Sequence, residues 1–191
     1  ESGKLPSAFD VVNGQFHVGQ GAAFAVFESE EGLAMSGFTP KAYLLGAYTA
    51  SERCANAMGQ LEDGTGFVRA AEGAIEMAKV KPSDIRIVKT HGTGTESNNK
   101  AEGAALTHLL PDGFVATSLK PTIGHTMGAS GLLETALLLD ALRENTVPAI
   151  KNRTEDDRVY LSEAVTAPDG LVLSMAAGMG NIYSAAVFKR A

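Results

Sequence analysis

The chain has 191 residues, in which short apolar runs alternate with longer stretches that carry apolar residues every three or four positions. The short runs, bounded by glycine, proline or charged residues, predict strands, and the longer stretches predict helices. We expect strands over 16–21, 24–27, 42–48, 85–88, 114–117, 171–174 and 184–188, and helices over 67–80, 98–110 and 132–143. Strands that alternate with helices along a chain indicate the α/β class.

Four segments of the chain carry a more specific prediction. Residues 132–143 are apolar on almost every side, which predicts a buried helix. Residues 42–48 are apolar at both alternating positions, which is typical of a strand covered on both faces of its sheet. Residues 28–36 are polar and predict a mobile connection, and residues 49–66 predict a long loop of the kind that often has a function.

Three loops rich in small residues each follow a predicted strand, namely 90–95, 124–131 and 178–180. In open α/β sheets, ligands bind beyond the carboxyl ends of the strands. Two of the loops hold a histidine, His91 and His125. Two imidazoles that converge on one pocket could donate hydrogen bonds to a developing oxyanion, or could act as acid and base near neutral pH.

Lys120 and Glu134 flank His125 at positions where they could pair with each other or orient the ring. A histidine beside glycine is also common as a structural turn residue, and this interpretation stays open for His91 and His125. For His17 and His108, neither of which lies in a glycine-rich loop, the structural interpretation is favoured.

Composition excludes several classes of function. The net charge is −6 with acids and bases scattered, so we expect no binding to nucleic acid or to a membrane surface. Cys54 is the only cysteine and the four histidines are not closely paired, so we expect neither a disulfide nor a metal site. The cysteine usage fits a cytoplasmic protein. The length suits a single domain over residues 1–191, or one half of a two-part fold.

The histidine motifs resemble a known family. The run His91-Gly-Thr-Gly-Thr, followed by Lys120-Pro-Thr-Ile-Gly-His-Thr-Met-Gly-Ala-Ser-Gly, resembles the C-terminal half of the β-ketoacyl synthases. The resemblance implies a thiolase-like α/β fold. This chain would form its C-terminal half, a mixed five-stranded sheet with a buried helix after His125. An N-terminal half that is not in this chain would complete the fold.

The resemblance also implies a reaction, the decarboxylative condensation of malonyl-acyl carrier protein with an acyl thioester in fatty-acid or polyketide synthesis. His91 and His125 would bind the thioester carbonyl and stabilise the enolate, with Lys120 and Glu134 ordering them. The backbone N–H of Met179, beside Gly178, would contribute to an oxyanion hole. The substrate-binding set would also include Thr93 and Thr95, along the pantetheine arm.

The implied partners are acyl carrier protein and a separate or cleaved N-terminal half that bears the nucleophilic cysteine, in a homo- or heterodimer. The chain would hold no cofactor of its own, since the substrates ride on the phosphopantetheine of the carrier. Cys54 lies in a context that does not match the family's nucleophile.

Three further positions depart from the family pattern. Asn99 stands where the family has an acid, residues 13–15 where it has Arg-Asp-Gly, and Met179 where it has Phe. The departures at Asn99 and Met179 motivate an alternative, a non-catalytic partner subunit similar to a chain-length factor. The presence of both histidines argues against this alternative.

Overall fold

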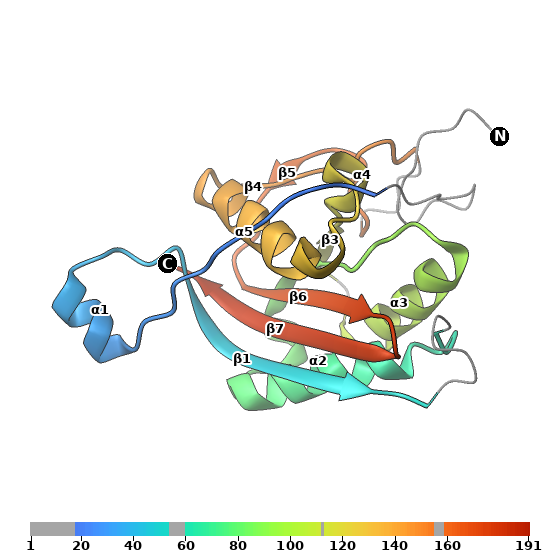
Figure 1. Ribbon diagram of the computed structural model, residues 1–191, viewed down its shortest axis with the longest axis horizontal. Helices are drawn as coiled ribbons and strands as arrows, with labels where there is room; N and C mark the ends of the chain where they lie inside the picture. The colour runs from blue at the N-terminus through green and yellow to red at the C-terminus, as the bar shows by residue number, and fades with distance from the viewer. Residues whose placement is uncertain (1–17, 54–59, 112, 155–158) are drawn as a thin grey trace.

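A five-stranded mixed sheet forms the centre of the protein. The computed structural model describes residues 18–53, 60–111, 113–154 and 159–191. The strand order across the sheet is β1 (Ala42–Ser51), β7 (Ile182–Arg190), β6 (Leu171–Gly178), β2 (Ile85–Lys89) and β3 (Val115–Thr117) (Figure 1). The pairs β1–β7 and β6–β7 are antiparallel, whereas β2 runs parallel to both β6 and β3. The mixed five-stranded sheet that the resemblance implied is therefore present.

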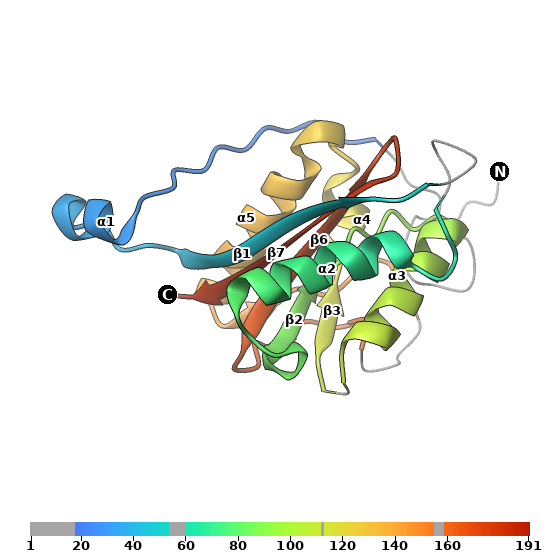
Figure 2. The same cartoon turned by 90° about the horizontal axis from the view of Figure 1, so that it is seen from below.

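Helices lie on both faces of this sheet. Figure 2 shows α2 (Thr65–Ala78) and α3 (Glu96–Leu109) on one face and α5 (Ser130–Arg143) on the other. The smaller elements are α1 (Glu30–Ser36), α4 (Lys120–Ile123), two 3-10 turns (Pro82–Asp84 and Met127–Ala129) and the pair β4 (Thr146–Val147) and β5 (Val165–Thr166). The helices predicted from 67, 98 and 132 onward, and the strands from 42, 85, 114, 171 and 184, are confirmed with shifted ends.

The larger part of the core lies between the sheet and the pair α2 and α3. Phe67, Ala71 and Ala74 of α2 are buried there, at the spacing that brings them onto one side of a helix. The N-terminus of α3 is capped by Thr95, whose hydroxyl accepts a hydrogen bond from the backbone N–H of Asn98. This cap fixes the point at which the His91 loop becomes helix.

Helix α5 is buried only on the side that faces the sheet. Leu138 and Leu142 pack there against Ile87 and other apolar residues of a second cluster. Leu132 and Leu137 of the same helix are each 39% exposed. The helix predicted to be buried on all sides thus has an open face in this chain.

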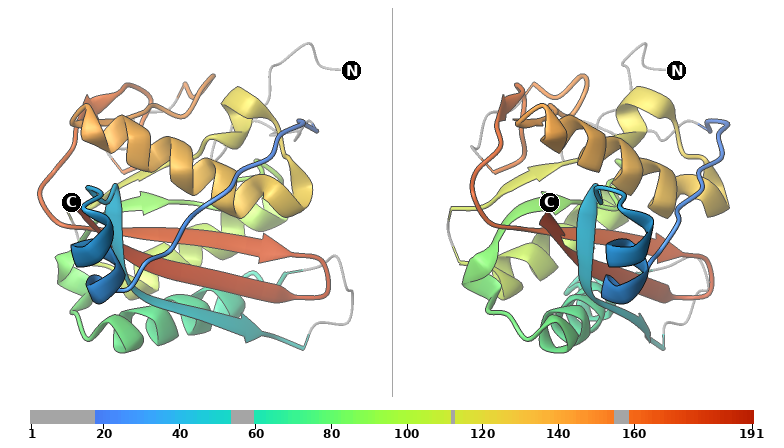
Figure 3. Two further views of the ribbon diagram at one scale, coloured as in Figure 1. Left: turned by 60° about the vertical axis from the view of Figure 1, so that its left-hand side comes forward. Right: turned by 90° about the vertical axis from the view of Figure 1, so that its left-hand side faces the viewer.

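The prediction of a strand over 24–27 is wrong. Residues 19–29 form an extended segment outside the sheet, which runs beside α5 in Figures 1 and 3. Phe24 is 95% exposed, Val26 90% and Phe27 70%. The segment is tied at one end, where the backbone N–H of Gly19 donates to the carbonyl of His125. Of the strand predicted over 16–21, the described part has only an isolated bridge, from Val18 to His125.

The polar connection predicted over 28–36 is mostly helix α1. Ser29 caps it by accepting a hydrogen bond from the N–H of Gly32, and two acids lie in its first turn. Gly37 ends it in the left-handed conformation, at φ 68°.

Two further predictions need correction. The glycine-rich loop predicted over 178–180 begins one residue later, because β6 continues to Gly178 and residues 179–181 form the turn into β7. Strand β1 is not covered on both faces, since Tyr43, Leu44 and Tyr48 are exposed. Cys54, His17 and residues 13–15 lie outside the described residues.

Candidate active site

The three glycine-rich loops meet at one edge of the sheet. Strands β2, β3 and β6 are parallel in pairs, so their carboxyl ends share this edge. His91 follows β2, His125 follows β3 through the short helix α4, and the Gly178 turn follows β6. The loops surround a pocket of about 640 Å³. Its lining includes His91, Thr93, Thr95, His125, Ser130, Gly178 and Met179.

The two imidazoles converge, as the loop pattern predicts. Their ring centroids are 5.7 Å apart, with an edge-to-face angle of 81°. The side chain of His91 is buried, and its Nδ1 atom has no hydrogen-bonding partner in the part of the chain that the structure describes. Burial lowers the pKa of His91 well below its usual value, and the charges of Lys120 and Lys89 lower it further. His91 is therefore neutral near pH 7.

His125 has a defined tautomer. Its Nδ1 accepts a hydrogen bond of 3.1 Å from the backbone N–H of Met127, a residue held at φ 52°. In the neutral ring the proton must then be on Nε2, which makes Nε2 a donor. Burial and the charge of Lys120 lower the pKa of His125, with a smaller contribution from Lys89, against the opposing charge of Glu134.

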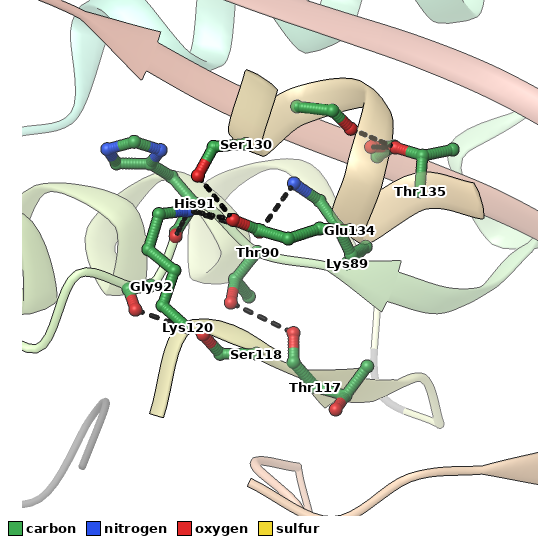
Figure 4. Close-up of polar contacts among 12 residues, drawn as sticks. Lys89, Thr90, His91, Gly92, Thr117, Ser118, Lys120, Ser130, Glu134 and Thr135 are labelled. Atoms are coloured by element: carbon green, nitrogen blue, oxygen red, sulfur yellow. Dashed lines mark hydrogen bonds and ion pairs between the residues drawn. The ribbon is translucent and has the colours of Figure 1, made fainter. Parts of the chain in front are cut away.

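Lys120 and Glu134 form the ion pair that their sequence positions suggested. Lys120 Nζ lies 2.8 Å from Glu134 Oε1, and both side chains are buried (Figure 4). Lys120 also donates to the backbone carbonyl of His91, and Ser130 links Glu134 Oε1 to His125 Nδ1 through contacts of 2.8 and 3.1 Å. Burial lowers the pKa of Lys120 to about 8. One pair thus supports both histidine loops.

A second lysine, Lys89, also contacts Glu134. The sequence patterns did not predict this residue as part of the site. Its Nζ lies 3.2 Å from Glu134 Oε2, and neither side chain is accessible to solvent. Figure 4 shows the two lysines approaching one carboxylate from different elements. Burial alone would raise the pKa of Glu134, but the charges of Lys89 and Lys120 outweigh it and hold the pKa below its usual value. A lysine that ends an apolar strand just before a histidine loop was the available signal.

Glu102 of α3 is a second residue that was missed. Its carboxylate accepts hydrogen bonds from the backbone N–H groups of His91 and Gly92 and from the side-chain amide of Asn98. Burial raises the pKa of Glu102, and these donors oppose the rise. The signal was a single acid among the apolar positions of the helix, one turn after Asn98. Its effect is to hold the backbone of the His91 loop.

Glycine is required where this loop meets its neighbour. Gly92 has φ 52°, and a Cβ atom there would lie 2.3 Å from Ser118 Oγ. That hydroxyl donates to the carbonyl of Gly92 at 3.0 Å. A side chain at residue 92 would push the His91 loop away from the segment that carries Lys120.

The four predicted substrate-binding residues lie around the rim of the pocket. Thr93 and Thr95 are half-buried, with their hydroxyls 3.2 Å apart. Gly178 and Met179 are exposed at the β6–β7 turn, with Met179 70% exposed. The fold therefore brings the eight predicted site residues together. Six of them line the pocket, and Lys120 and Glu134 lie behind its two histidines. Its chemistry is that of two neutral imidazoles backed by a buried network of charges.

The amino-acid sequence of the chain matches the model of a protein family. Residues 42–154, more than half of the chain, match the model of the β-ketoacyl synthase C-terminal domain. The chain belongs to the β-ketoacyl synthase family. Its extended segment and α1 precede the matched region, which begins with β1.

Curated relatives and solved structures agree with this assignment. A putative polyketide β-ketoacyl synthase 1 of Streptomyces halstedii is 32% identical over 187 residues, which are 94% of this chain and 44% of the relative. This β-ketoacyl synthase chain therefore spans less than half the length of the curated relatives it matches.

Two solved structures share the thiolase-like fold of ketosynthases. The ishigamide ketosynthase/chain length factor has a TM-score of 0.88 at 24% identity, over all of this chain and 48% of its own. A type II polyketide ketosynthase in complex with its acyl carrier protein has a TM-score of 0.84 at 21% identity, over 98% of this chain and 48% of that chain. Among the described residues of this β-ketoacyl synthase domain, no helix has both the length and the apolar character that a membrane span requires.

Proposed function

We propose that this chain is the histidine-bearing half of a β-ketoacyl-[acyl carrier protein] synthase, an acyltransferase. It acts with a separate or cleaved N-terminal half that supplies the cysteine. The observation that supports this proposal most directly is that the imidazoles of His91 and His125 line one pocket, with their ring centroids 5.7 Å apart. The reaction is the condensation of malonyl-acyl carrier protein with an acyl thioester, in fatty-acid or polyketide synthesis in the cytoplasm.

Decarboxylation is the step for which this half supplies the stabilising histidines, in a pocket that the other half completes. The malonyl carboxylate leaves as CO₂, and the electrons of the broken C–C bond form an enolate on the thioester. His125 Nε2–H and the imidazole of His91 donate to the enolate oxygen. Neutral imidazoles aimed at a developing negative charge stabilise it without reorganisation. Lys120 and Glu134 position the rings and do not touch the substrate.

Condensation requires the other half. The enolate carbon attacks the carbonyl of the acyl group on the cysteine, and the cysteine thiolate then leaves. The backbone N–H of Met179 donates to the oxyanion of this intermediate, and Thr93 and Thr95 line the path of the pantetheine arm. The acyl carrier protein brings both substrates on its phosphopantetheine, so the chain needs no resident cofactor. One of the ketosynthases of similar structure was solved in complex with its acyl carrier protein, which supports acyl carrier protein as a partner of this chain.

Reconstitution tests the proposal. The chain and its cysteine-bearing half are purified separately, mixed in equal amounts and given malonyl-acyl carrier protein together with an acyl thioester. We expect CO₂ release and a condensation product from the mixture, and neither from either half alone. A stable mixed assembly that releases no CO₂ would contradict the proposed enzyme.

An open apolar face supports the need for another half. It consists of Phe24, Val26, Phe27, Leu132 and Leu137, all exposed. The first three lie on the extended segment, and the other two lie on α5, beside which this segment runs (Figure 3). Exposed apolar side chains gathered on neighbouring segments are typical of protein interfaces. The relatives are more than twice as long as the chain, so a second half of similar size is available to cover this face.

Substituting Phe24 with Asp is expected to weaken association with the cysteine-bearing half by about 30-fold or more, the effect of losing one central interface residue. Isothermal titration calorimetry measures the affinity. Met77→Asp is the matched control, because Met77 is exposed on α2, across the sheet from α5. Equal binding by the Phe24→Asp variant would show that the second half docks elsewhere.

The alternative is a non-catalytic subunit similar to a chain-length factor. A ketosynthase paired with a chain-length factor is among the structural neighbours. Asn99, where the family has an acid, has a buried Oδ1 without a partner in the described part of the chain. This alternative expects a stable complex with a synthase that is complete without the chain, and CO₂ release that does not depend on His125.

A further inference from the structure

Lys89 is buried beside the proposed site, and the roles proposed above do not use it. It is the last residue of β2, two positions before His91, and it points into the interior with no accessible surface. Its Nζ lies 3.2 Å from Glu134 Oε2. A lysine is rarely fully buried, because its charge loses the solvation of water, so this placement requires a compensating interaction.

Glu134 is shared unequally between the two lysines. Lys120 Nζ lies 2.8 Å from Oε1 and 3.0 Å from Oε2, while Lys89 contacts Oε2 alone. Without Lys89, Lys120 would still contact both oxygens of Glu134, but Oε2 would lose one of its two lysine donors. A second buried cation is more than the carboxylate needs, and its charge acts on the groups around it.

The groups that face the two imidazoles come from four elements. Lys89 ends β2, Lys120 begins α4, Glu134 lies on α5 and Glu102 lies on α3. The carboxylate of Glu102 is directed to the backbone N–H groups of His91 and Gly92. That of Glu134 is directed to the lysines and Ser130. Both carboxylates are thus engaged by donors other than the rings.

We propose that Lys89 is a positioning residue that holds Glu134 jointly with Lys120 and, through its buried positive charge, adds to the effect of Lys120 in keeping His91 and His125 in their neutral, hydrogen-bond-donating form. This role rests on the proposed function of the two histidines. It explains why a second lysine is buried where one already satisfies the carboxylate.

Protonation would disable His125 for a structural reason. A proton on Nδ1 would turn the acceptor of the Met127 N–H into a donor directed at another donor. Burial and the charge of Lys120 are the larger causes that lower the pKa of His91 and of His125, and the charge of Lys89 adds to them. It also lowers the pKa of Lys120, whose value is about 8.

The test is an NMR titration of ¹⁵N-labelled imidazoles in the purified chain, before and after Lys89→Met. We expect the titration midpoints of His91 and His125 to move to higher pH, since a neighbouring positive charge is removed. Lys89→Gln keeps a donor near Glu134 Oε2 and is used if the Met variant does not fold. Lys100→Met is the matched control, because it removes the same charge from an exposed site that pairs with Glu62 and Glu96. Unmoved midpoints in a folded Lys89 variant would overturn the proposal.

The pH profile of malonyl decarboxylation by the reconstituted enzyme gives the second readout. Both the acid and the alkaline limb are expected to shift to higher pH in the Lys89 variants. A purely structural role would lower the rate evenly and leave both limbs in place. The titration needs no catalysis, so it separates failure of this inference from failure of the proposed function. If the midpoints shift in a protein that releases no CO₂, the effect of Lys89 on the two imidazoles stands and the proposed function fails.

Discussion

Replacing His125 with Ala is expected to lower the rate of malonyl decarboxylation by about 10²- to 10³-fold, the usual effect of removing one donor to an oxyanion. The variant loses the Nε2–H donor while the buried Lys120–Glu134 pair remains in place. The measurement is CO₂ release from malonyl-acyl carrier protein by the reconstituted halves. Because His125 is only half-buried, the fold is expected to survive the substitution.

His108→Ala is the control for this experiment. His108 is exposed in the last turn of α3, and its replacement is expected to leave the rate unchanged. If His125→Ala retains the full rate while the assembly forms normally, the enolate is stabilised elsewhere and the alternative of a non-catalytic subunit gains support.

Replacing Glu134 with Gln is expected to have the largest effect on stability. The change leaves Lys89 and Lys120 buried together without their shared carboxylate. Removing one member of a buried charge network commonly costs about 3–5 kcal/mol, because the remaining charge is uncompensated. Urea unfolding of the chain measures this loss as a lower midpoint. Glu72→Gln, at an exposed position of α2, is the matched control and is expected to leave the midpoint unchanged.

The pH dependence of stability gives the same substitution a second signature. The pKa of Glu134 is held below its usual value, so its stabilising contribution is complete above the pKa of the unfolded chain. That contribution is lost as the pH falls from the usual range of a glutamate through the lower, folded value. We expect the Glu134→Gln variant to lack this part of the acid destabilisation. The double variant Lys89→Met with Glu134→Gln should be less destabilised than Glu134→Gln alone, since one uncompensated charge is gone.

Most of the sheet could be predicted because its strands are apolar runs packed within this chain. The segment over 24–27 has the same composition, but the described chain offers no sheet beside it, so it stays extended and exposed. The composition of a segment shows that it has apolar side chains to bury. It does not show whether the surface that would bury them belongs to the same chain or to another. Helix α1 was missed because its signals are local, in the cap Ser29 and the terminal Gly37, and not in an apolar stripe.

The site could be predicted in part for a similar reason. Glycine-held histidines after strands are visible in the sequence, and so is the spacing of Lys120 and Glu134. Lys89 and Glu102 were missed because charged residues are expected at the surface, and their burial depends on contacts between elements distant in sequence. Both were recognisable only once β2, α3 and α5 were placed around the His91 loop.

The extended segment over 19–29 has a consequence for the life of this chain before assembly. Its backbone groups are not paired in a sheet, and its aromatic side chains face solvent, which is the description of a strand edge that recruits other strands. At high concentration the isolated chain is therefore expected to self-associate through this segment. Under the proposed function, the cysteine-bearing half would compete with this self-association by covering the same segment.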